Sequence, residues 1–270
     1  MSRFQAVFGD RKPIIAMVHL GASPGTPLHD PAQGVEGILA AARADLRALQ
    51  AAGFDAVMFG NENDRPYELK VDTATSATMA YIIGRLRDEI TVPFGVNVLW
   101  DPMSSFAVAA ATGAAFVREI FTGTYASDMG VWAPDAGAAV RYAQRLGAGG
   151  VARLYNVSAE FADSLDRRPL PDRARSAVFS SIPDAVLVSG AITGEAARME
   201  DLEGVKRVLP TPPVLANTGV KHATVADVLA VADGCIVGSA LKHGGDTWAA
   251  VDPDRAADFM ARARAARGGK

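Results

Sequence analysis

The chain has 270 residues, of which 49% are hydrophobic and 21% are charged, and its formal net charge at pH 7 is −3. This is the composition of an ordinary globular protein that can bury one large core or two small ones. Because there is no dense run of Lys and Arg, the chain lacks the broad basic surface that nucleic acid requires, and we expect no nucleic acid partner.

The N-terminal segment MSRFQAVFGDRK has no uninterrupted apolar stretch, and the run FAVAAATGAAFV is too short to span a bilayer. We therefore expect no targeting segment and no membrane insertion. The single cysteine, Cys235, lies within an apolar run and has no second cysteine for an intramolecular disulfide. It is expected to be a core residue, and a reducing cytoplasm is the expected location.

Short runs of β-branched and apolar residues alternate along the chain with longer segments of helical character. Such alternation is typical of repeated strand–helix units that form a parallel sheet. In chain order, the predicted strands span residues 13–20, 54–60, 93–99, 115–121, 151–157, 184–190, 213–219 and 234–239.

Two of the intervening segments have the pattern of an amphipathic helix. In VEGILAAARADLRALQAA, Ile38, Ala42, Leu46 and Leu49 recur at steps of four and three, which places them on one face. In TVADVLAVADG, Thr224 is a candidate N-cap. The segment TGTYASDMGVWAP, after the fourth predicted strand, is expected to be a long loop that could act as a lid.

Eight strands alternating with helices over roughly 250 residues match the strand count and length of a (β/α)8 barrel. An open doubly wound sheet is the alternative, but no G-x-G-x-x-G motif follows the first strand. We find no linker, low-complexity tract or second domain. The prediction is therefore a single α/β domain, a (β/α)8 TIM barrel over residues 1–270, with its chemistry at the C-terminal ends of the strands.

Small and polar residues replace bulky ones where the last three predicted strands end, in SGAITG, ANTGV and IVGSALK. In barrels that bind phosphorylated substrates, the loops after strands seven and eight present backbone N–H groups to the phosphate, and glycine permits the close approach. Lys242 or Lys221 would add a charge. Simple turn chemistry is the alternative explanation for these glycines. The predicted phosphate-binding residues are Gly190, Asn217, Thr218, Gly219, Gly238 and Ser239.

Two carboxylates are the main candidates for catalysis. Glu119 lies within the apolar run AFVREIF, where a charge is costly unless it is paired or functional. Glu62 follows the second strand in GNEND and is otherwise a solvated loop residue. If both face one cavity, their pKa values would separate into those of an acid and a base.

Two further charged or titratable residues stand near these carboxylates. His19 ends the first strand and is either a strand-cap residue or a proton shuttle that assists Glu62 and Glu119. Arg118 alternates to the opposite side of its strand from Glu119, so we expect it to face the helices or solvent.

Asparagines recur at the predicted strand ends, and few aromatic residues accompany them. They have no titratable proton at neutral pH, so they would orient sugar hydroxyls or a carbonyl. No H-E-x-x-H motif or Cys/His cluster is present. We predict no metal site and no cofactor, although Mg²⁺ could bind together with a substrate phosphate. The predicted substrate-binding residues are Asn61, Asn97, Asn156 and Ser189.

The segments HLGASPGTP, GFDAVMFGNEND, VSGAITG and above all ADGCIVGSALKHGG followed by VDPDRAADFM resemble the BtpA family, also called BtpA/SgcQ, over about residues 13–265. The resemblance implies a phosphate-binding barrel of the ribulose-phosphate-binding type. It implies no single reaction, because one branch is linked to photosystem I biogenesis in cyanobacteria and another to sugar uptake and metabolism. Around the fifth strand, members tend to carry an Asp- and His-rich segment where this chain reads ARLYNVSAEFADS. A function that relatives owe to those side chains is not expected here.

Together these features favour an enzyme that acts on a phosphorylated sugar or glycosyl compound by carboxylate acid/base chemistry. Isomerase, lyase and glycosidase reactions all stay open. The alternative is a non-catalytic assembly or stabilising factor, of the photosystem I biogenesis type, that retains the phosphate-binding cup. We expect a phosphorylated small molecule as the partner and a homo-oligomer, because barrels often bury apolar helix faces against copies of themselves.

Overall fold

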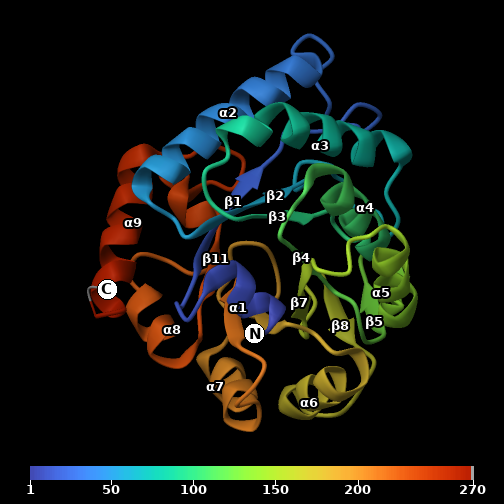
Figure 1. The fold of residues 1–270 in the computed structure, drawn as a ribbon, viewed down its shortest axis with the longest axis vertical. Helices are drawn as coiled ribbons and strands as arrows, with labels where there is room; N and C mark the ends of the chain where they lie inside the picture. The colour runs from blue at the N-terminus through green and yellow to red at the C-terminus, as the bar shows by residue number, and fades with distance from the viewer. Residues whose placement is uncertain (269–270) are drawn as a thin grey trace.

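The computed structural model describes residues 1–268 and shows a closed barrel of eight parallel strands surrounded by helices (Figure 1). Pairing of the last strand with the first closes the barrel. Each strand lies inside one of the eight predicted segments, so the predicted (β/α)8 fold is confirmed. The barrel strands are β1 (Ile14–His19), β2 (Ala56–Gly60), β3 (Phe94–Asn97), β4 (Phe116–Glu119), β7 (Ala152–Asn156), β9 (Ala185–Ser189), β10 (Val214–Asn217) and β11 (Cys235–Val237).

The helices form the outer layer of the barrel (Figure 1). The predicted apolar face of α2 is confirmed, since all four of its expected core residues are buried. Thr224 occupies the N-cap position of α8, but its hydroxyl accepts from the backbone N–H of Lys221 and does not cap the helix. The outer helices are α2 (Gly34–Ala52), α3 (Thr73–Leu86), α4 (Pro102–Thr112), α5 (Ala136–Arg145), α6 (Leu170–Ser181), α7 (Met199–Val208), α8 (Val225–Val231) and α9 (Pro253–Ala266), with short 3-10 turns η1 (Arg87–Glu89), η2 (Ser239–Leu241) and η3 (His243–Gly245).

Side chains of the barrel strands alternate between two apolar clusters. One lies between strands and helices, and the other fills the barrel interior with residues such as Met58, Phe116 and Leu154. Helix α1 (Arg3–Phe8) closes one end of this interior and lies across the barrel in Figure 1. Gly95 of β3 leaves space for the ring of Phe116, because a Cβ at this position would overlap that ring.

A small antiparallel sheet accompanies the barrel and was not predicted. It consists of β5 (Tyr125–Ser127), β6 (Gly130–Trp132) and β8 (Ala162–Ser164), in the order β6-β5-β8. The segment expected to be a long loop therefore carries two strands. Tyr125 and Trp132 pack with Trp100 in a third apolar cluster, and the ring centroids of Trp100 and Trp132 are 5.3 Å apart.

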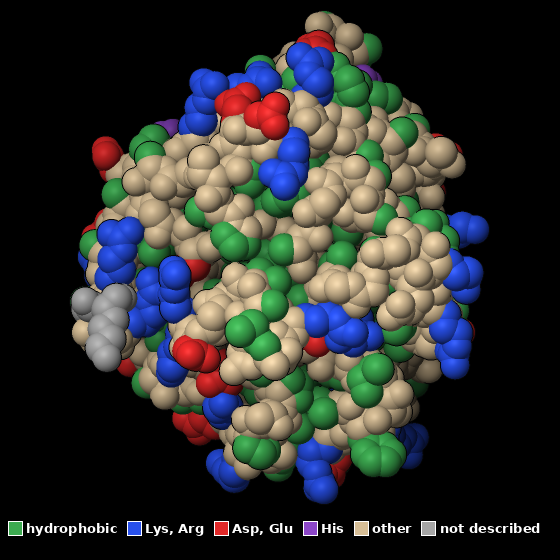
Figure 2. Space-filling model, in the orientation of Figure 1, with side chains coloured by type: hydrophobic (Ala, Val, Ile, Leu, Met, Phe, Trp, Pro, Cys, Tyr) green, Lys and Arg blue, Asp and Glu red, His purple; other side chains and the backbone are tan. Residues whose placement is uncertain are grey.

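Charged side chains are mixed in sign on the face that carries α1. Figure 2 shows Lys and Arg interspersed with Asp and Glu, and most of these charges lie toward the margin of the view.

Among residues 1–268, no helix combines the length and apolar character needed to cross a bilayer. Large apolar side chains are also exposed at the end of α6, where Phe179 is 92% exposed. The oligomeric state stays a prediction.

Candidate active site

A small polar cavity, here called the inner cavity, lies at the end of the barrel where the strands terminate. Its volume is about 40 Å³. One water molecule needs ~10–15 Å³ by this measure, so the cavity has room for only a few waters. The polar residues that line it are His19, Glu62, Arg118, Glu160, Thr193, Asn217, Thr218 and Ser239, together with Gly194, Gly219 and Gly238.

Glu62 lines the inner cavity and carries a buried, unpartnered carboxylate oxygen. The residue is 4% exposed, and among the described residues its buried Oε2 has no hydrogen-bond partner. Gly60 makes this pose possible, because a Cβ there would lie 2.7 Å from both carboxylate oxygens of Glu62. Burial raises the pKa of Glu62 to about 7, although the charges of Arg118 and Lys242 oppose the shift. Near pH 7 the protonated and ionised forms of this carboxyl are therefore both populated.

His19 lies beside Glu62, with its Nε2 3.5 Å from Oε1 of the carboxyl. Burial lowers the pKa of His19 to about 3, and the charge of Lys242 contributes to this shift. The Nδ1 atom is 3.4 Å from the carbonyl oxygen of Thr247. Because a carbonyl only accepts, this contact favours a neutral ring with its proton on Nδ1, which leaves Nε2 as an acceptor toward Glu62.

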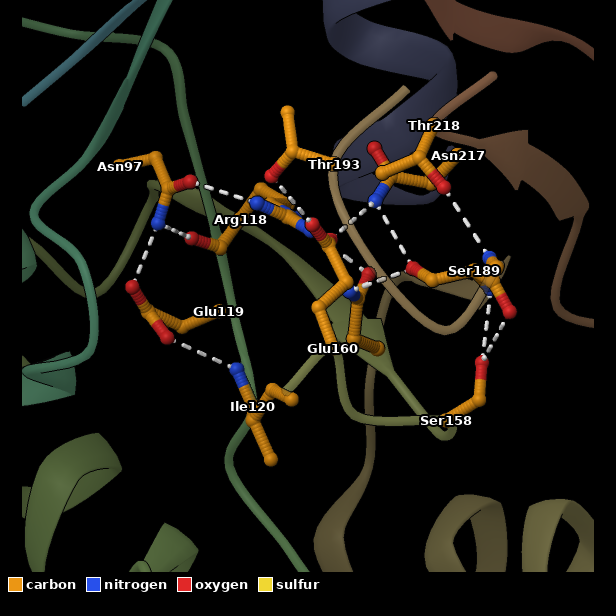
Figure 3. A network of polar contacts seen from close by, with 12 residues as sticks. Asn97, Arg118, Glu119, Ile120, Ser158, Glu160, Ser189, Thr193, Asn217 and Thr218 are labelled. Atoms are coloured by element: carbon orange, nitrogen blue, oxygen red, sulfur yellow. Dashed lines mark hydrogen bonds and ion pairs between the residues drawn. The ribbon is translucent and has the colours of Figure 1, made fainter. Parts of the chain in front are cut away.

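Arg118 points into the mouth of the barrel, so the expectation that it faces helices or solvent was wrong. It is 4% exposed, and it donates to Asn97 Oδ1 at 2.7 Å and to Glu160 Oε1 at 2.5 Å (Figure 3). Phe116, two residues earlier in β4, points into the barrel interior. Because side chains alternate along a strand, Arg118 takes the same inward direction.

Glu119 is buried, but it is not among the residues that line the inner cavity. Its Oε1 accepts from Asn97 Nδ2 at 2.5 Å and its Oε2 from the Ile120 N–H at 2.9 Å (Figure 3). Burial raises its pKa to about 8, although the charge of Arg118 opposes the shift. The structure therefore does not bring Glu119 and Glu62 to one cavity, and Glu119 instead orients Asn97, which in turn holds Arg118.

Glu160 is a cavity residue that the sequence did not single out. It follows β7, is 2% exposed, and pairs with Arg118. Its oxygens also accept from Thr193 Oγ1 at 3.0 Å and from Asn217 Nδ2 at 3.3 Å. Its position shortly after a barrel strand was a usable signal, because polar residues there reach the active end of the barrel.

The four predicted substrate-binding residues surround the inner cavity without lining it. Asn61 Oδ1 accepts from the backbone N–H of Leu99 at 2.7 Å. The amide of Asn156 donates to Ser189 Oγ at 2.8 Å, and the amide of Asn217 donates to the same hydroxyl at 2.8 Å. Together with Asn97, these side chains are engaged in internal hydrogen bonds that position the cavity walls.

A larger outer cavity of about 650 Å³ adjoins the inner one, since both are lined by Gly194, Gly219, Gly238 and Ser239. The loops after β10 and β11 meet there, as the phosphate-cup prediction requires, and η2 begins at Ser239. The outer cavity also has two cationic residues in its lining, Lys221 and Arg255. The acidic Glu195 lines this cavity, a vestibule to the inner one, as well, so two cationic residues and one carboxylate share its wall.

Two of the predicted cup glycines also have a packing role. A Cβ at Gly190 or Gly219 would overlap the backbone around Glu195, so these glycines allow the loop after β9 to pack against the end of β10. Thr218, at φ +60°, joins the two loops: its Oγ1 accepts from the Gly190 N–H at 3.0 Å and donates to the Glu195 carbonyl at 2.9 Å. Gly238 instead faces the ring of His19.

Lys242 is not among the residues that line either cavity, although its charge influences the pKa values of His19 and Glu62. Its ammonium is buried, donates to the Ala249 carbonyl at 2.9 Å and lies 3.6 Å from Asp45 Oδ2 on α2. Burial lowers its pKa. Over residues 1–268, no group of three or more His, Cys, Asp or Glu side chains is arranged to hold a metal ion. The predicted lack of a metal site stays a prediction.

A closed barrel with a polar cavity where its strands terminate places the chain among the TIM-barrel proteins. Ligand-free tryptophan synthase of Mycobacterium tuberculosis matches with a TM-score of 0.61 and 19% identity, over 98% of this chain and 100% of that chain. Phosphoribosylanthranilate isomerase of Pyrococcus furiosus matches with a TM-score of 0.55 and 14% identity, over 94% and 100% of the two chains. At such low identity these likenesses concern the fold alone.

The particular family is given by the sequence comparisons. The BtpA family model matches residues 10–265, so the chain belongs to the BtpA family, and the predicted resemblance is confirmed. The sgc region protein SgcQ of Escherichia coli (strain K12) is 47% identical over 96% of this chain and 97% of its own length. The photosystem I biogenesis protein BtpA of Synechocystis sp. (strain ATCC 27184 / PCC 6803 / Kazusa) is 31% identical over 96% and 90%.

Proposed function

We propose that this BtpA-family barrel is an enzyme that acts on a phosphorylated sugar or glycosyl compound, with Glu62 as its proton-transfer group. The observation that carries the proposal is that Glu62, which lines the inner cavity, has a buried carboxylate oxygen, Oε2, without a hydrogen-bond partner. Buried polar atoms normally have a partner, and an exception at the active end of a barrel favours a role in binding or catalysis.

The phosphate of the substrate would bind in the outer cavity. The two cavities share lining residues, among them Gly219, Gly238 and Ser239. A ligand whose phosphate binds in the outer cavity would therefore extend its other end into the inner cavity. Lys221 and Arg255 supply positive charge to the vestibule. This arrangement follows the phosphate sites of other barrels, which also use the loops after the seventh and eighth strands.

Glu62 suits general acid/base catalysis because its pKa of about 7 lies near physiological pH. The carboxyl would exchange the proton with the substrate, and when it is protonated on Oε1 it would donate to the acceptor nitrogen Nε2 of His19, 3.5 Å away. Arg118 and Glu160 would bind the oxygens of the reacting end. Glu119 would act as a positioning residue through Asn97, outside the reacting centre.

A sugar does not fit into the inner cavity of about 40 Å³, so binding requires the cavity to open. The loop after β9 supplies Thr193 and Gly194 to the lining, and Thr193 is held by its hydrogen bond to Glu160. Replacement of that hydrogen bond by a substrate hydroxyl would release the loop, as in other enzymes with mobile active-site loops.

The test is a thermal-shift screen of sugar phosphates and nucleoside monophosphates, each paired with its dephosphorylated form, followed by a product assay on each hit. We expect stabilisation that requires the phosphate, and turnover that Glu62→Gln abolishes while binding persists. Glu203→Gln, an exposed carboxylate on α7, is the control and should retain full turnover. Turnover that survives in Glu62→Gln would contradict the proposed role of Glu62.

The second candidate function is a non-catalytic factor that retains the phosphate site. It is favoured by the Arg118–Glu160 ion pair, which closes the inner cavity with groups already satisfied by the protein. One relative is named as a photosystem I biogenesis protein. Phosphate-dependent stabilisation without turnover of any hit would support this candidate over the enzyme.

A further inference from the structure

A separate cavity of about 170 Å³, here called the α6 cavity, lies between α6 and the chain that follows β4 and β7. It has no lining residue in common with the inner or outer cavity. Because one water molecule needs ~10–15 Å³ by this measure, the α6 cavity has room for a small metabolite. It is therefore separate from the inner and outer cavities, but it adjoins another cavity of about 740 Å³, since Tyr125, Ser164, Arg168 and Arg173 line both.

Arg173 is the feature of this cavity that most requires explanation. It lies on the side of α6 that lines the α6 cavity, and within the described part of the chain its guanidinium forms no ion pair. Its buried Nε donates no hydrogen bond. The residue as a whole is half-buried, so only Nε is shielded from water, and the rest of the guanidinium is open to the cavity and to solvent.

The nearest acidic residue of the cavity is already engaged. Both oxygens of Asp166 accept from Arg168, with Nε–Oδ1 and Nε–Oδ2 distances of 3.0 Å and an Nη2–Oδ2 distance of 2.5 Å. These hydrogen bonds hold the pKa of Asp166 at about 2, so its charge is retained and is matched by Arg168. The lining of the α6 cavity thus holds two arginines and one aspartate, and Arg173 is the arginine that forms no ion pair among residues 1–268, although Asp163, Glu195 and Asp201 line the neighbouring cavity.

Hydroxyl groups complete the donor set around this positive charge. Ser176 and Ser180 lie on α6 at three and seven residues from Arg173, and Thr122 and Ser164 lie on the opposite wall. Arginine with several hydroxyls can surround a tetrahedral oxyanion with donors, whereas a neutral sugar would leave the guanidinium without a charged acceptor. We propose that the α6 cavity binds a phosphate group, as inorganic phosphate or as the phosphoryl end of a small metabolite, through Arg173.

An optical signal for binding is built into the neighbouring sheet. Tyr125 lines the α6 cavity, and its ring centroid is 5.6 Å from that of Trp132. Trp132 in turn packs on Trp100, which lines the inner cavity. Occupation of the α6 cavity is therefore expected to change tryptophan fluorescence, and a Trp248→Phe background removes the third tryptophan.

The experiment titrates this background protein with inorganic phosphate, glycerol phosphate and acetate at constant ionic strength and follows tryptophan fluorescence. We expect saturable binding of phosphate or glycerol phosphate that Arg173→Gln weakens by about tenfold or more, because charge-assisted hydrogen bonds are lost. Arg173→Lys, which keeps the charge without the fork of donors, should give an intermediate affinity.

One control separates this site from a general loss of charge on α6. Arg175→Gln removes an exposed charge from the same helix and should retain the fluorescence-detected affinity. Circular dichroism checks the fold of each variant. Equal affinity in the Arg173→Gln protein and its parent, saturable binding of acetate alone, or no saturable binding of any anion would overturn the proposal.

Discussion

Replacement of Glu62 by Gln should make the folded protein more stable at alkaline pH. Burial raises the pKa of Glu62 from 4.5 to about 7 in the folded chain. Between these two values the folded protein holds a proton that the unfolded chain has already released. The free energy of unfolding contributed by Glu62 is therefore greatest below pH 4.5 and is lost as the pH rises through 7. Glutamine has the same shape and no such loss.

The magnitude follows from the size of the shift. One pKa unit corresponds to about 1.4 kcal/mol, so the whole window contributes about 3 kcal/mol, of which about 2 kcal/mol is lost between pH 5.5 and 8. Glu119, whose pKa is raised to about 8, weakens the fold with rising pH in the same direction. His19, whose pKa is lowered to about 3, acts in the opposite direction below pH 6.5. Glu119 and His19 remain in the variant, so the difference in the free energy of unfolding between parent and variant reports the contribution of Glu62.

The assay is equilibrium urea unfolding of the parent, Glu62→Gln and Glu203→Gln at pH 5.5 and pH 8. The parent minus Glu62→Gln difference should change by about 2 kcal/mol between the two pH values. Glu203→Gln, which removes an exposed carboxylate, should follow the parent. If parent and Glu62→Gln change in parallel, Glu62 is not a desolvated acid and the argument for its proton-transfer role fails.

Other single substitutions test the packing and charges around the site. Gly95→Ala should lower the free energy of unfolding by ~1–3 kcal/mol in urea, because the new Cβ would overlap the aromatic ring beside it; an unchanged midpoint would contradict this overlap. Gly238→Ala places a Cβ 3.1 Å from Cε1 and Nε2 of His19, so the imidazole NMR signals should shift in a folded protein, and identical signals would argue against the contact. Lys242→Met leaves the buried Asp45 without its ion-pair partner and should lower the free energy of unfolding in urea by ~3–5 kcal/mol. Adding Asp45→Asn should recover part of this loss. Equal stability of the single variant and the parent would show that the ion pair does not stabilise the fold.

The barrel was predictable because each of its strands is part of a short buried run between helical segments. The sequence did not predict which side chains of a strand point into the barrel and which point toward the helices. In β4, Phe116 and Val117 are both fully buried, one inside the barrel and one beneath the helices. Parallel barrel strands are buried on both faces, so hydrophobic alternation does not tell which face is inside. This ambiguity reversed the expected directions of Arg118 and Glu119.

Two other features depend on contacts between distant parts of the chain. The strands of the small sheet have three residues each, and they form where Tyr125 and Trp132 pack against Trp100. Glu160 is 42 residues from Arg118, and its burial makes sense only once the barrel has brought the two together. The glycines of the predicted phosphate cup lie at one end of the barrel, and phosphate binding itself stays a prediction; their contacts with a neighbouring loop could not be read from the sequence.

The residues at positions 60 and 62 constrain each other sterically, so substitutions at these two positions are expected to be coupled. The carboxylate of Glu62 occupies the volume that any side chain at position 60 would need. A relative that acquires a side chain at position 60 must therefore relocate or lose the glutamate at position 62, and the two substitutions should appear together. Within the family, glycine at the first of these positions thus becomes a marker by which members with the same carboxylate arrangement can be recognised.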